Sequence, residues 1–274
     1  MTVALYRPFC KQRVYFDRQL NDMVYRLDRI FPTPDHQNVG FYVTGVGSDK
    51  PFSVLATDVL PDLAFWGSSN GQFLARYTYV QGDSTGDLFS EAELGTTAAP
   101  GGWTQVDNIS DDVLADYRAA YGQTVTKDDV FAYVYGLLHS SDYRVAYAAD
   151  LKKMLPRIPK VASLEDFRAF VDAGTRLAAL HVGYEAVEPY PLREVTAGPV
   201  TLRVVKMRFG KRGKDKDRST VVYNSSLTLT GIPEQAHEYM LALGGRVGDG
   251  ALPSQDRQGE RHRQRPQRLG QRGR

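Results

Sequence analysis

The sequence predicts an α+β fold, with a β-rich N-terminal part, a helical middle subdomain and a basic β-hairpin near the C-terminus. Residues 1–80 contain short runs of β-branched and aromatic residues, whereas residues 110–182 have apolar residues at helical spacing. Strand-like alternation then returns at residues 200–231. A chain of 274 residues with 42% hydrophobic residues is long enough to bury a substantial core.

The predicted strands of the N-terminal part are bounded by Gly, Asp, Asn and Pro, as is typical of short strands. They are expected at residues 6–16 (interrupted early by Pro8), 39–47, 52–60, 63–67 and 73–80. Residues 68–72 contain Asn70-Gly71 and predict a hairpin turn. Residues 81–102 are small, polar and glycine-rich, and predict a loop.

Four helices are predicted in the middle of the chain, because capping residues precede apolar residues at helical spacing. The expected caps are Ser110, Thr126 and Ser163, and Gly122 and Pro156 end two of the helices. The helices are expected at residues 111–121, 130–140, 140–155 and 164–183.

The C-terminal part is predicted to contain two strands, at residues 200–209 and 218–231, joined by the charged loop 210–217. Residues 231–241 are expected to start another helix, with Pro233 in its first turn. The expected divisions of the chain are residues 1–105, 106–190, 191–241 and 242–274.

The sequence contains no recognisable catalytic motif: phosphate-binding loop, dinucleotide fingerprint, zinc-protease and nucleophile-elbow patterns are all absent. A single cysteine, Cys10, excludes an internal disulfide and is expected to be a buried, inert thiol. No segment resembles a signal peptide or a membrane span, so we expect a cytoplasmic protein without membrane contact.

Histidines and paired carboxylates are explained more simply by helix ends than by metal or acid–base chemistry. The five histidines are isolated in sequence, and two of them, His139 and His181, are expected at helix ends as dipole partners or core-edge residues. The acidic pairs Asp111-Asp112 and Asp128-Asp129 lie in predicted first turns, where carboxylates complement the helix dipole. The other three histidines are His36, His237 and His262. We therefore expect no metal site.

The net charge of +2 conceals an uneven distribution. Residues 244–274 contain eight arginines and three carboxylates, a balance of +5, which leaves −3 for residues 1–243. The overall positive charge is therefore not evidence for nucleic-acid binding by the folded part.

The predicted hairpin is the strongest candidate for binding a polyanion, since seven cations face only two carboxylates across residues 206–218, a balance of +5. The alternative is a solvated hairpin tip. The cations are Lys206, Arg208, Lys211, Arg212, Lys214, Lys216 and Arg218.

A second cluster lies near the N-terminus, where alternation places residues on one face of a strand that could equally be half-exposed for structural reasons. It consists of Tyr6, Arg7, Lys11 and Arg13. Amide side chains suited to reading bases are Asn70, Gln72 and Asn224, although turn chemistry explains Asn70 and Asn224 equally well.

Several stretches together resemble the C-terminal target recognition region of Type ISP restriction–modification enzymes. They are YRPFCKQRVYFDRQLND, DNISDDVLADYRAAYG, TKDDVFAYVYGLLHSSDYRVAYAADLKKMLPRIP, LHVGYEAVEPYP and VVKMRFGKRGKDKDRSTVVYNSSLTLTGIPEQAHEY, which cover nearly all of residues 5–240.

The resemblance implies a module for sequence-specific recognition of double-stranded DNA. Upstream methyltransferase and ATPase domains of a parent polypeptide would hold the catalytic centres and use ATP, Mg²⁺ and S-adenosylmethionine. The Asn/Asp-Pro-Pro-Tyr/Phe signature of the methyltransferase is absent here, so no catalytic residue is carried over and no cofactor is expected in this chain.

Two alternatives remain open. The chain could be a docking module for a methyltransferase or ATPase partner, which a large exposed apolar patch on residues 110–182 would favour. It could instead be a stand-alone enzyme, which a deep pocket containing carboxylates of perturbed pKa would favour.

The resemblance stops near Met240, and residues from about 242 onward are rich in Arg, Gln and Gly. With permitted codons, the sequence from Arg246 read one nucleotide later gives GWVMERYQVKTDK, which resembles the family's continuation. We therefore predict that this tail is an out-of-frame translation, and that it is disordered.

Overall fold

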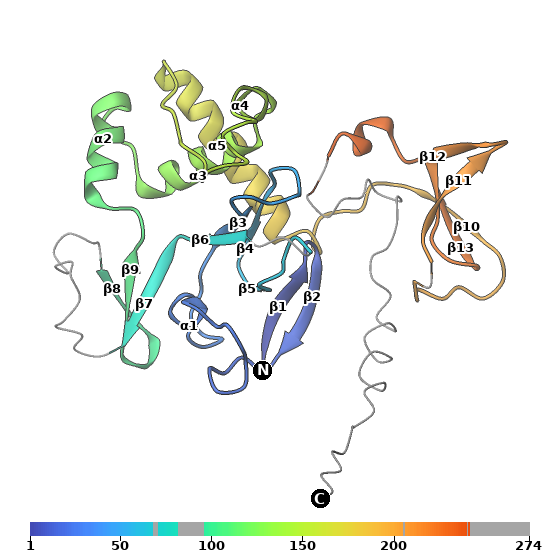
Figure 1. The fold of residues 1–274 in the computed structure, drawn as a ribbon, viewed down its shortest axis with the longest axis horizontal. Helices are drawn as coiled ribbons and strands as arrows, with labels where there is room; N and C mark the ends of the chain where they lie inside the picture. Colours follow the sequence, from blue (N-terminus) through green and yellow to red (C-terminus); the bar gives the residue numbers. More distant parts are fainter. Residues whose placement is uncertain (68–70, 82–95, 205, 240, 242–274) are drawn as a thin grey trace, which may run out of the picture. The chain divides into compact units, whose positions relative to one another are not determined.

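The computed structural model of the protein describes residues 1–67, 71–81, 96–204, 206–239 and 241. The chain divides into two compact units, Met1–Val187 and Glu188–Arg274. The chain contains helices as well as several small sheets, so the prediction of an α+β fold is confirmed (Figure 1).

The N-terminal unit begins with three small sheets. In the first, β1 (Thr2–Arg7) forms a hairpin with β2 (Cys10–Val14) and also pairs in parallel with β5 (Leu60–Pro61). In the second, β3 (Gly40–Thr44) lies between β4 (Val54–Thr57) and β6 (Gly71–Ala75). In the third, β9 (Trp103–Asp107) lies between β7 (Tyr77–Gln81) and β8 (Thr96–Ala99).

Three details of the predicted β structure are wrong. Residues 63–67 do not form a strand: Trp66 makes a single β-bridge, and the other four residues form turns. Phe65 and Trp66 are fully buried beside Tyr42, so the apolar run reflects burial. The predicted strand 73–80 is divided between β6 and β7 at Arg76, whose side chain is buried. The predicted loop 81–102 contains β8, and its residues 82–95 lie outside the described part.

The helices of the N-terminal unit are α1 (Leu27–Ile30), α2 (Asp111–Tyr121), α3 (Lys127–His139), α4 (Ser141–Ala146) and α5 (Leu164–Val182). The predicted caps form: the side chains of Ser110, Thr126 and Ser163 accept hydrogen bonds from backbone N–H groups in the first turns of α2, α3 and α5. Thr126 and Asp129 complete a reciprocal capping box.

The helix expected at 140–155 is much shorter, because α4 ends at Ala146. The chain then makes successive turns that bury Leu151 and allow the carbonyl of Lys152 to accept a hydrogen bond from the N–H of Gly47, 3.0 Å away. These contacts depend on the turns that follow α4, so they would be lost if the helix continued to residue 155.

The core of this unit is centred on α3, where Tyr133 and Tyr135 are fully buried. Helix α5 packs on α3 and contributes Phe167, whose ring stacks on Tyr121 with centroids 4.3 Å apart. The hydroxyl of Tyr135 accepts a hydrogen bond from the N–H of Ala56, which ties the helices to β4.

The C-terminal unit contains one antiparallel sheet in the order β10 (Arg193–Thr196), β13 (Leu227–Thr230), β12 (Asp215–Val222) and β11 (Arg208–Arg212). Phe209 of β11 is buried, and its ring packs edge-on against the imidazole of His237. His237 ends a short 3₁₀ turn, η2 (Glu234–His237).

The basic hairpin is therefore confirmed, but its boundaries differ from those predicted. Residues 201–204 and 206–207 are not in strands, and residues 210–217 are mostly strand rather than loop. The helix expected from 231 is a single 3₁₀ turn, because Pro233 is extended, with ψ of 149°, rather than in the first turn of an α-helix. Residues 240 and 242–274, including the predicted disordered tail, lie outside the described part.

Candidate nucleic-acid interface

The basic hairpin extends beyond the sheet as a two-stranded ribbon. Strand β13 pairs with β12 only at residues 220–222, whereas β11 and β12 pair with each other from Arg208 to the turn. The segment from Gly210 to Asp217 therefore has no further strand beside it among the described residues. We call this segment the ribbon (Figure 1).

A bulge marks the point where the ribbon leaves the sheet. Phe209 pairs with Val221, but the next residue, Gly210, pairs with Asp217, so residues 218–220 are additional on β12. A β-carbon on Gly210 would lie 2.9 Å from Cβ of Thr220, so only glycine fits beside the bulge without displacement.

Asp217 holds this bulge in shape. Its carboxylate accepts hydrogen bonds from the N–H and hydroxyl of Ser219, at 3.0 and 2.6 Å, and from the hydroxyl of Thr220 at 3.2 Å. The hydrogen bonds from Ser219 lower the pKa of Asp217. Sequence reasoning counted Asp217 only as a charge and missed this role, although the order Asp-x-Ser-Thr is a recognisable local capping pattern.

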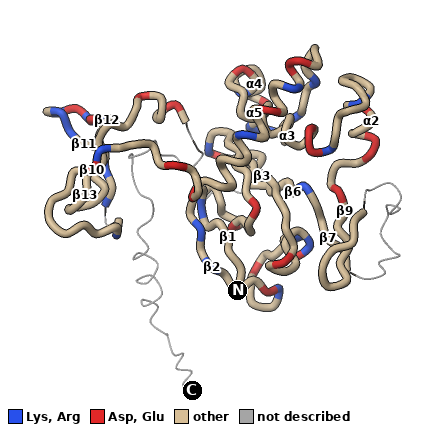
Figure 2. The backbone as a smooth tube through the Cα atoms, turned by 180° about the vertical axis from the view of Figure 1, so that it is seen from behind, with Lys and Arg blue, Asp and Glu red and all other residues tan. Residues whose placement is uncertain are grey.

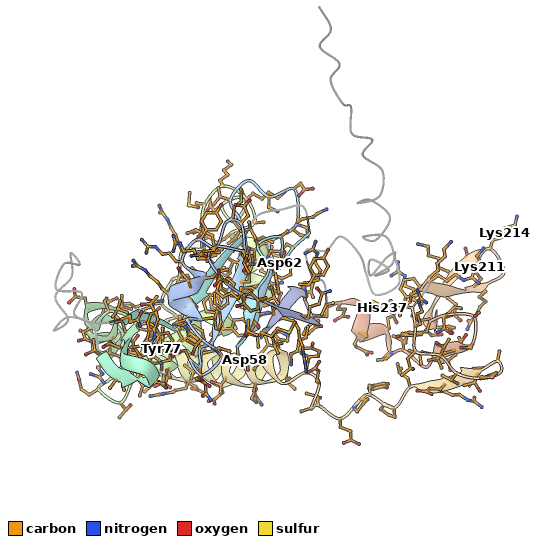
Figure 3. The ribbon with its side chains drawn as sticks, turned by 90° about the horizontal axis from the view of Figure 1, so that it is seen from below. Asp58, Asp62, Tyr77, Lys211, Lys214 and His237 are labelled. Atoms are coloured by element: carbon orange, nitrogen blue, oxygen red, sulfur yellow. The ribbon has the colours of Figure 1, made fainter. Side chains whose placement is uncertain are left out.

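The ribbon closes through a two-residue turn at Gly213 and Lys214, between the paired residues Arg212 and Asp215. Gly213 has a φ of 66°, which favours glycine at the first position of such a turn. Figure 3 shows Lys214 and Lys211 projecting from this end of the hairpin.

All seven predicted cations of the hairpin are exposed. Figure 2 shows blue, basic segments on the β11–β12 hairpin. Lys211 and Lys216 lie directly opposite each other in the ladder. Like charges in this position repel, which destabilises an isolated hairpin. No carboxylate of the described residues forms an ion pair with Lys211, Arg212, Lys214 or Arg218.

The second predicted cluster is largely occupied by internal contacts. The guanidinium of Arg7 lies 4.0 Å from the ring centre of Tyr6 and 3.4 Å from a carboxylate oxygen of Asp62. Lys11 forms an ion pair of 2.7 Å with Glu185. Arg13 differs, because it is exposed and makes no ion pair with any described residue.

Asn224 is a structural residue and is removed from the base-reading candidates. It is buried, its amide N–H groups donate to the carbonyls of Thr201 and Arg203, and its oxygen accepts from the N–H groups of Ser226 and Leu227. No polar group of its side chain remains for a base, so the turn explanation holds.

The other two amide candidates have different outcomes. Gln72 is exposed on β6, opposite Val43, and its side chain is accessible. Asn70 lies outside the described residues. Neither is close in sequence to the hairpin, and their roles stay predictions.

The helix-end histidines belong to the edge of the core. The hydroxyl of Tyr135 lies 2.5 Å from Nδ1 of His181, and Nδ1 of His139 lies 2.9 Å from the carbonyl of Tyr135. Burial lowers the pKa of both imidazoles to about 4. Both are therefore uncharged at neutral pH, which excludes the predicted role as cationic dipole partners and leaves the core-edge interpretation.

The remaining predicted residues have structural explanations. Cys10 is half-buried rather than buried, because it begins β2 at the edge of its sheet. His36 is buried beside Tyr79 and Trp103, and His262 lies outside the described residues. The acidic pairs at 111–112 and 128–129 lie in the first turns of α2 and α3, as expected.

The features that would favour a stand-alone enzyme are not found in the described part of the chain. The carboxylates whose pKa is displaced there are those of the exposed Glu185 and the half-buried Asp217. Hydrogen bonds lower the pKa of both, from Lys11 to Glu185 and from Ser219 to Asp217. No group of three or more potential metal ligands occurs among the described residues. None of the helices described has the length and apolar character to cross a bilayer.

Comparison with known proteins identifies the family. The family model of the Type ISP C-terminal specificity domain matches residues 1–246. The chain therefore belongs to this family of specificity domains, and the resemblance inferred from sequence is confirmed. A search of curated proteins gave no match.

Three solved structures are similar to this chain. The "ATP-dependent Type ISP restriction-modification enzyme LlaBIII bound to DNA" is 30% identical with a TM-score of 0.70, and the match covers 88% of this chain and 14% of that one. The DrdV-DNA complex is 31% identical with a TM-score of 0.73, and the match covers 88% of this chain and 22% of that one. A nuclease-deletion mutant of the Type ISP enzyme LlaGI in complex with a DNA substrate mimic is 31% identical with a TM-score of 0.65. The match covers 90% of this chain and 16% of that one. The chain thus spans between 14% and 22% of the length of these proteins.

Proposed function

We propose that this chain recognises a specific sequence of double-stranded DNA as the target recognition module of a Type ISP restriction–modification enzyme. Membership of the specificity-domain family supports this function, as does the presence of DNA in the three similar structures. In this proposal the methyltransferase and ATPase domains lie upstream in a cytoplasmic parent polypeptide and supply catalysis, with ATP, Mg²⁺ and S-adenosylmethionine as their cofactors.

The observation that carries the proposal is the cationic ribbon. A two-stranded ribbon fits the major groove, which is about 12 Å wide. Lys211 and Lys216 lie directly opposite each other in the ladder, so the two strands bring their cations together. Phosphates would bind these cations and release counterions, which favours association with DNA.

The proposal is tested by measuring DNA binding of the chain at several salt concentrations. Changing Lys211, Arg212, Lys214 and Lys216 to alanine should weaken binding and reduce the slope of log Kd against log salt by about 3–4. The matched control removes four exposed cations from the helical part, Lys152, Lys153, Arg157 and Arg176, and should bind almost as the wild type does. Equal affinities of the two quadruple variants would refute the hairpin's role.

Because the C-terminal tail is rich in arginine, each measurement is repeated on a chain ending after Tyr239. The tail is expected to add nonspecific affinity to every variant equally, without affecting their order.

A docking role is a second candidate that one observation favours. Val145 is 79% exposed, and Tyr147, Met154 and Leu155 line a pocket of about 200 Å³ after α4. Such apolar exposure suits contact with an upstream domain. Val145→Glu should weaken association with a separately produced methyltransferase domain and leave DNA affinity unchanged, whereas unchanged association would remove this candidate.

A further inference from the structure

The two sides of the ribbon carry different chemistry. Directly paired residues lie on the same side, and sides alternate along a strand. Lys211 and Lys216 therefore share one side, whereas Arg212 and Asp215 share the other. The first side has ammonium groups only, and the second has a guanidinium beside a carboxylate.

We infer that Arg212 and Asp215 read the base edges of a G·C pair or of adjacent G·C pairs, while Lys211 and Lys216 contact phosphates. This inference rests on the proposed function and assigns its specificity to two named residues. A carboxylate is repelled by phosphate, so the side that contains Asp215 is unsuited to lie on the DNA backbone.

The base chemistry of this pair is defined by its donors and acceptors. Arginine donates two hydrogen bonds to O6 and N7 of guanine, and aspartate accepts one from N4 of cytosine. Arg212 and Asp215 are exposed, and neither forms an ion pair with a described residue. As opposite residues their β-carbons are about 5 Å apart, which compares with about 3.4 Å between successive bases of a strand.

The other carboxylate of the ribbon does not compete for this role. Asp217 is on the same side as Arg212, but its oxygens accept the hydrogen bonds from Ser219 and Thr220 that hold the bulge. The Asp217 carboxylate is therefore occupied at the bulge, and Asp215 is the carboxylate nearest the turn.

The lysines can reach phosphate from the opposite side. The strands of a ribbon are about 5 Å apart, and the groove is about 12 Å wide and about 8.5 Å deep. Phosphates therefore rise on both edges of a ribbon that faces the groove floor. Lys211 is on β11 and Lys216 is on β12, so each lysine comes from the strand that lies nearer one of these edges.

The test is selection of bound sequences from a randomised duplex pool by the full chain and its variants. The wild type should select a consensus with G·C at the position read by Arg212 and Asp215. Arg212→Gln and Asp215→Asn should each replace one of these preferences with adenine, because Gln and Asn pair with N6 and N7 of adenine. Affinity for the wild-type consensus duplex should fall roughly 5- to 150-fold in each variant.

Lys214→Gln is the matched control for charge, because it removes one cation from the exposed turn. It should weaken binding to all duplexes alike and keep the consensus. Lys211→Gln and Lys216→Gln should also keep the consensus, each with a salt slope smaller by about 1.

Two failures are distinguishable. If the wild type selects a consensus that Arg212→Gln and Asp215→Asn both retain, or that Lys211→Gln alters, the inference is wrong and the proposed function stands. If the wild type selects no consensus and binds independently of salt, the proposed function fails as well.

Discussion

Gly136 of α3 and Gly174 of α5 lie against each other in backbone contact. A β-carbon built on Gly174 would lie 2.8 Å from the backbone nitrogen of Gly136 and would overlap the carbonyl oxygen of Ala132. The two helices can approach this closely only because both positions lack a side chain. This contact fixes α5 against the aromatic core around Tyr133.

Gly174→Ala is therefore expected to lower the free energy of unfolding by about 1–3 kcal/mol, because the overlap outweighs the better helix propensity of alanine. Urea denaturation measures the effect. Ala173→Gly, at an exposed position of the same helix, should cost about 1 kcal/mol through propensity alone. A Gly174→Ala variant as stable as the wild type would contradict the close contact.

Stability should fall in mild acid because of His139 and His181. Burial lowers the pKa of both to about 4, whereas an exposed imidazole has a pKa of about 6.5. Between these values the unfolded chain binds more protons than the folded one. The stabilisation is therefore complete above about pH 6.5 and is lost as the pH falls toward 4.

The slope between pH 6.5 and 5 should approach roughly 1.4 kcal/mol per pH unit for each imidazole. Urea denaturation at pH 7, 6 and 5 measures it. The double variant His139→Gln/His181→Gln should show a flatter profile over this range, even if its stability at pH 7 is lower. An unchanged slope would show that these histidines are not responsible.

The buried Arg76 should be essential to the junction between the sheets and helices. Its guanidinium forms hydrogen bonds with Asp107 and, at 2.9 Å, with Asp128. Arg76→Ala leaves Asp107 buried without its main partner and should lower the free energy of unfolding by about 3–5 kcal/mol. Asp128 is 78% exposed, so Asp128→Asn should cost under about 1 kcal/mol. Comparable losses in the free energy of unfolding of the two variants would contradict the expectation that Asp107, rather than Asp128, is the critical partner of Arg76.

Asn224 should matter for the stability of the C-terminal unit rather than for base preference. Asn224→Ala removes the hydrogen bonds from the amide to the carbonyls of Thr201 and Arg203 and those that its oxygen accepts from two backbone N–H groups, and should cost about 2 kcal/mol or more. Hydrogen exchange of β12 and β13 amides reports the loss, with the exposed Ser225→Ala as control. A change in the selected DNA sequence with unchanged protection would instead support base reading.

Local capping made the helices predictable from sequence. Ser110, Thr126 and Ser163 each cap the helix expected of them, because the hydrogen bonds involved join residues only three apart. The length of α4 was not predictable in this way, since it depends on contacts of Leu151 and of the Lys152 carbonyl with distant residues. The same applies to residues 63–67, where only Trp66 makes a β-bridge and the burial of Phe65 and Trp66 explains the apolar run.

The candidate site was predictable as a set of charges but not as a surface. Composition identified the basic hairpin, yet the division of its residues between two sides depends on the register that pairs Lys211 with Lys216. Composition also could not separate free from occupied groups: Arg7 and Lys11 are held by Asp62 and Glu185. The frame of residues beyond 241 is a question for the gene's nucleotides and stays a prediction.

The bulge at residues 218–220 also determines how the ribbon can change in evolution. Because the sheet's pairing ends at Thr220, insertions between Gly210 and Asp217 leave the other strands undisturbed. Two residues added to each strand would lengthen the ribbon by about 7 Å and keep every side chain on its side. One residue added to each strand would exchange the two sides beyond the insertion. Insertions of two residues in each strand would therefore lengthen the ribbon without mixing its two chemically different sides, in a segment that no other described strand pairs with.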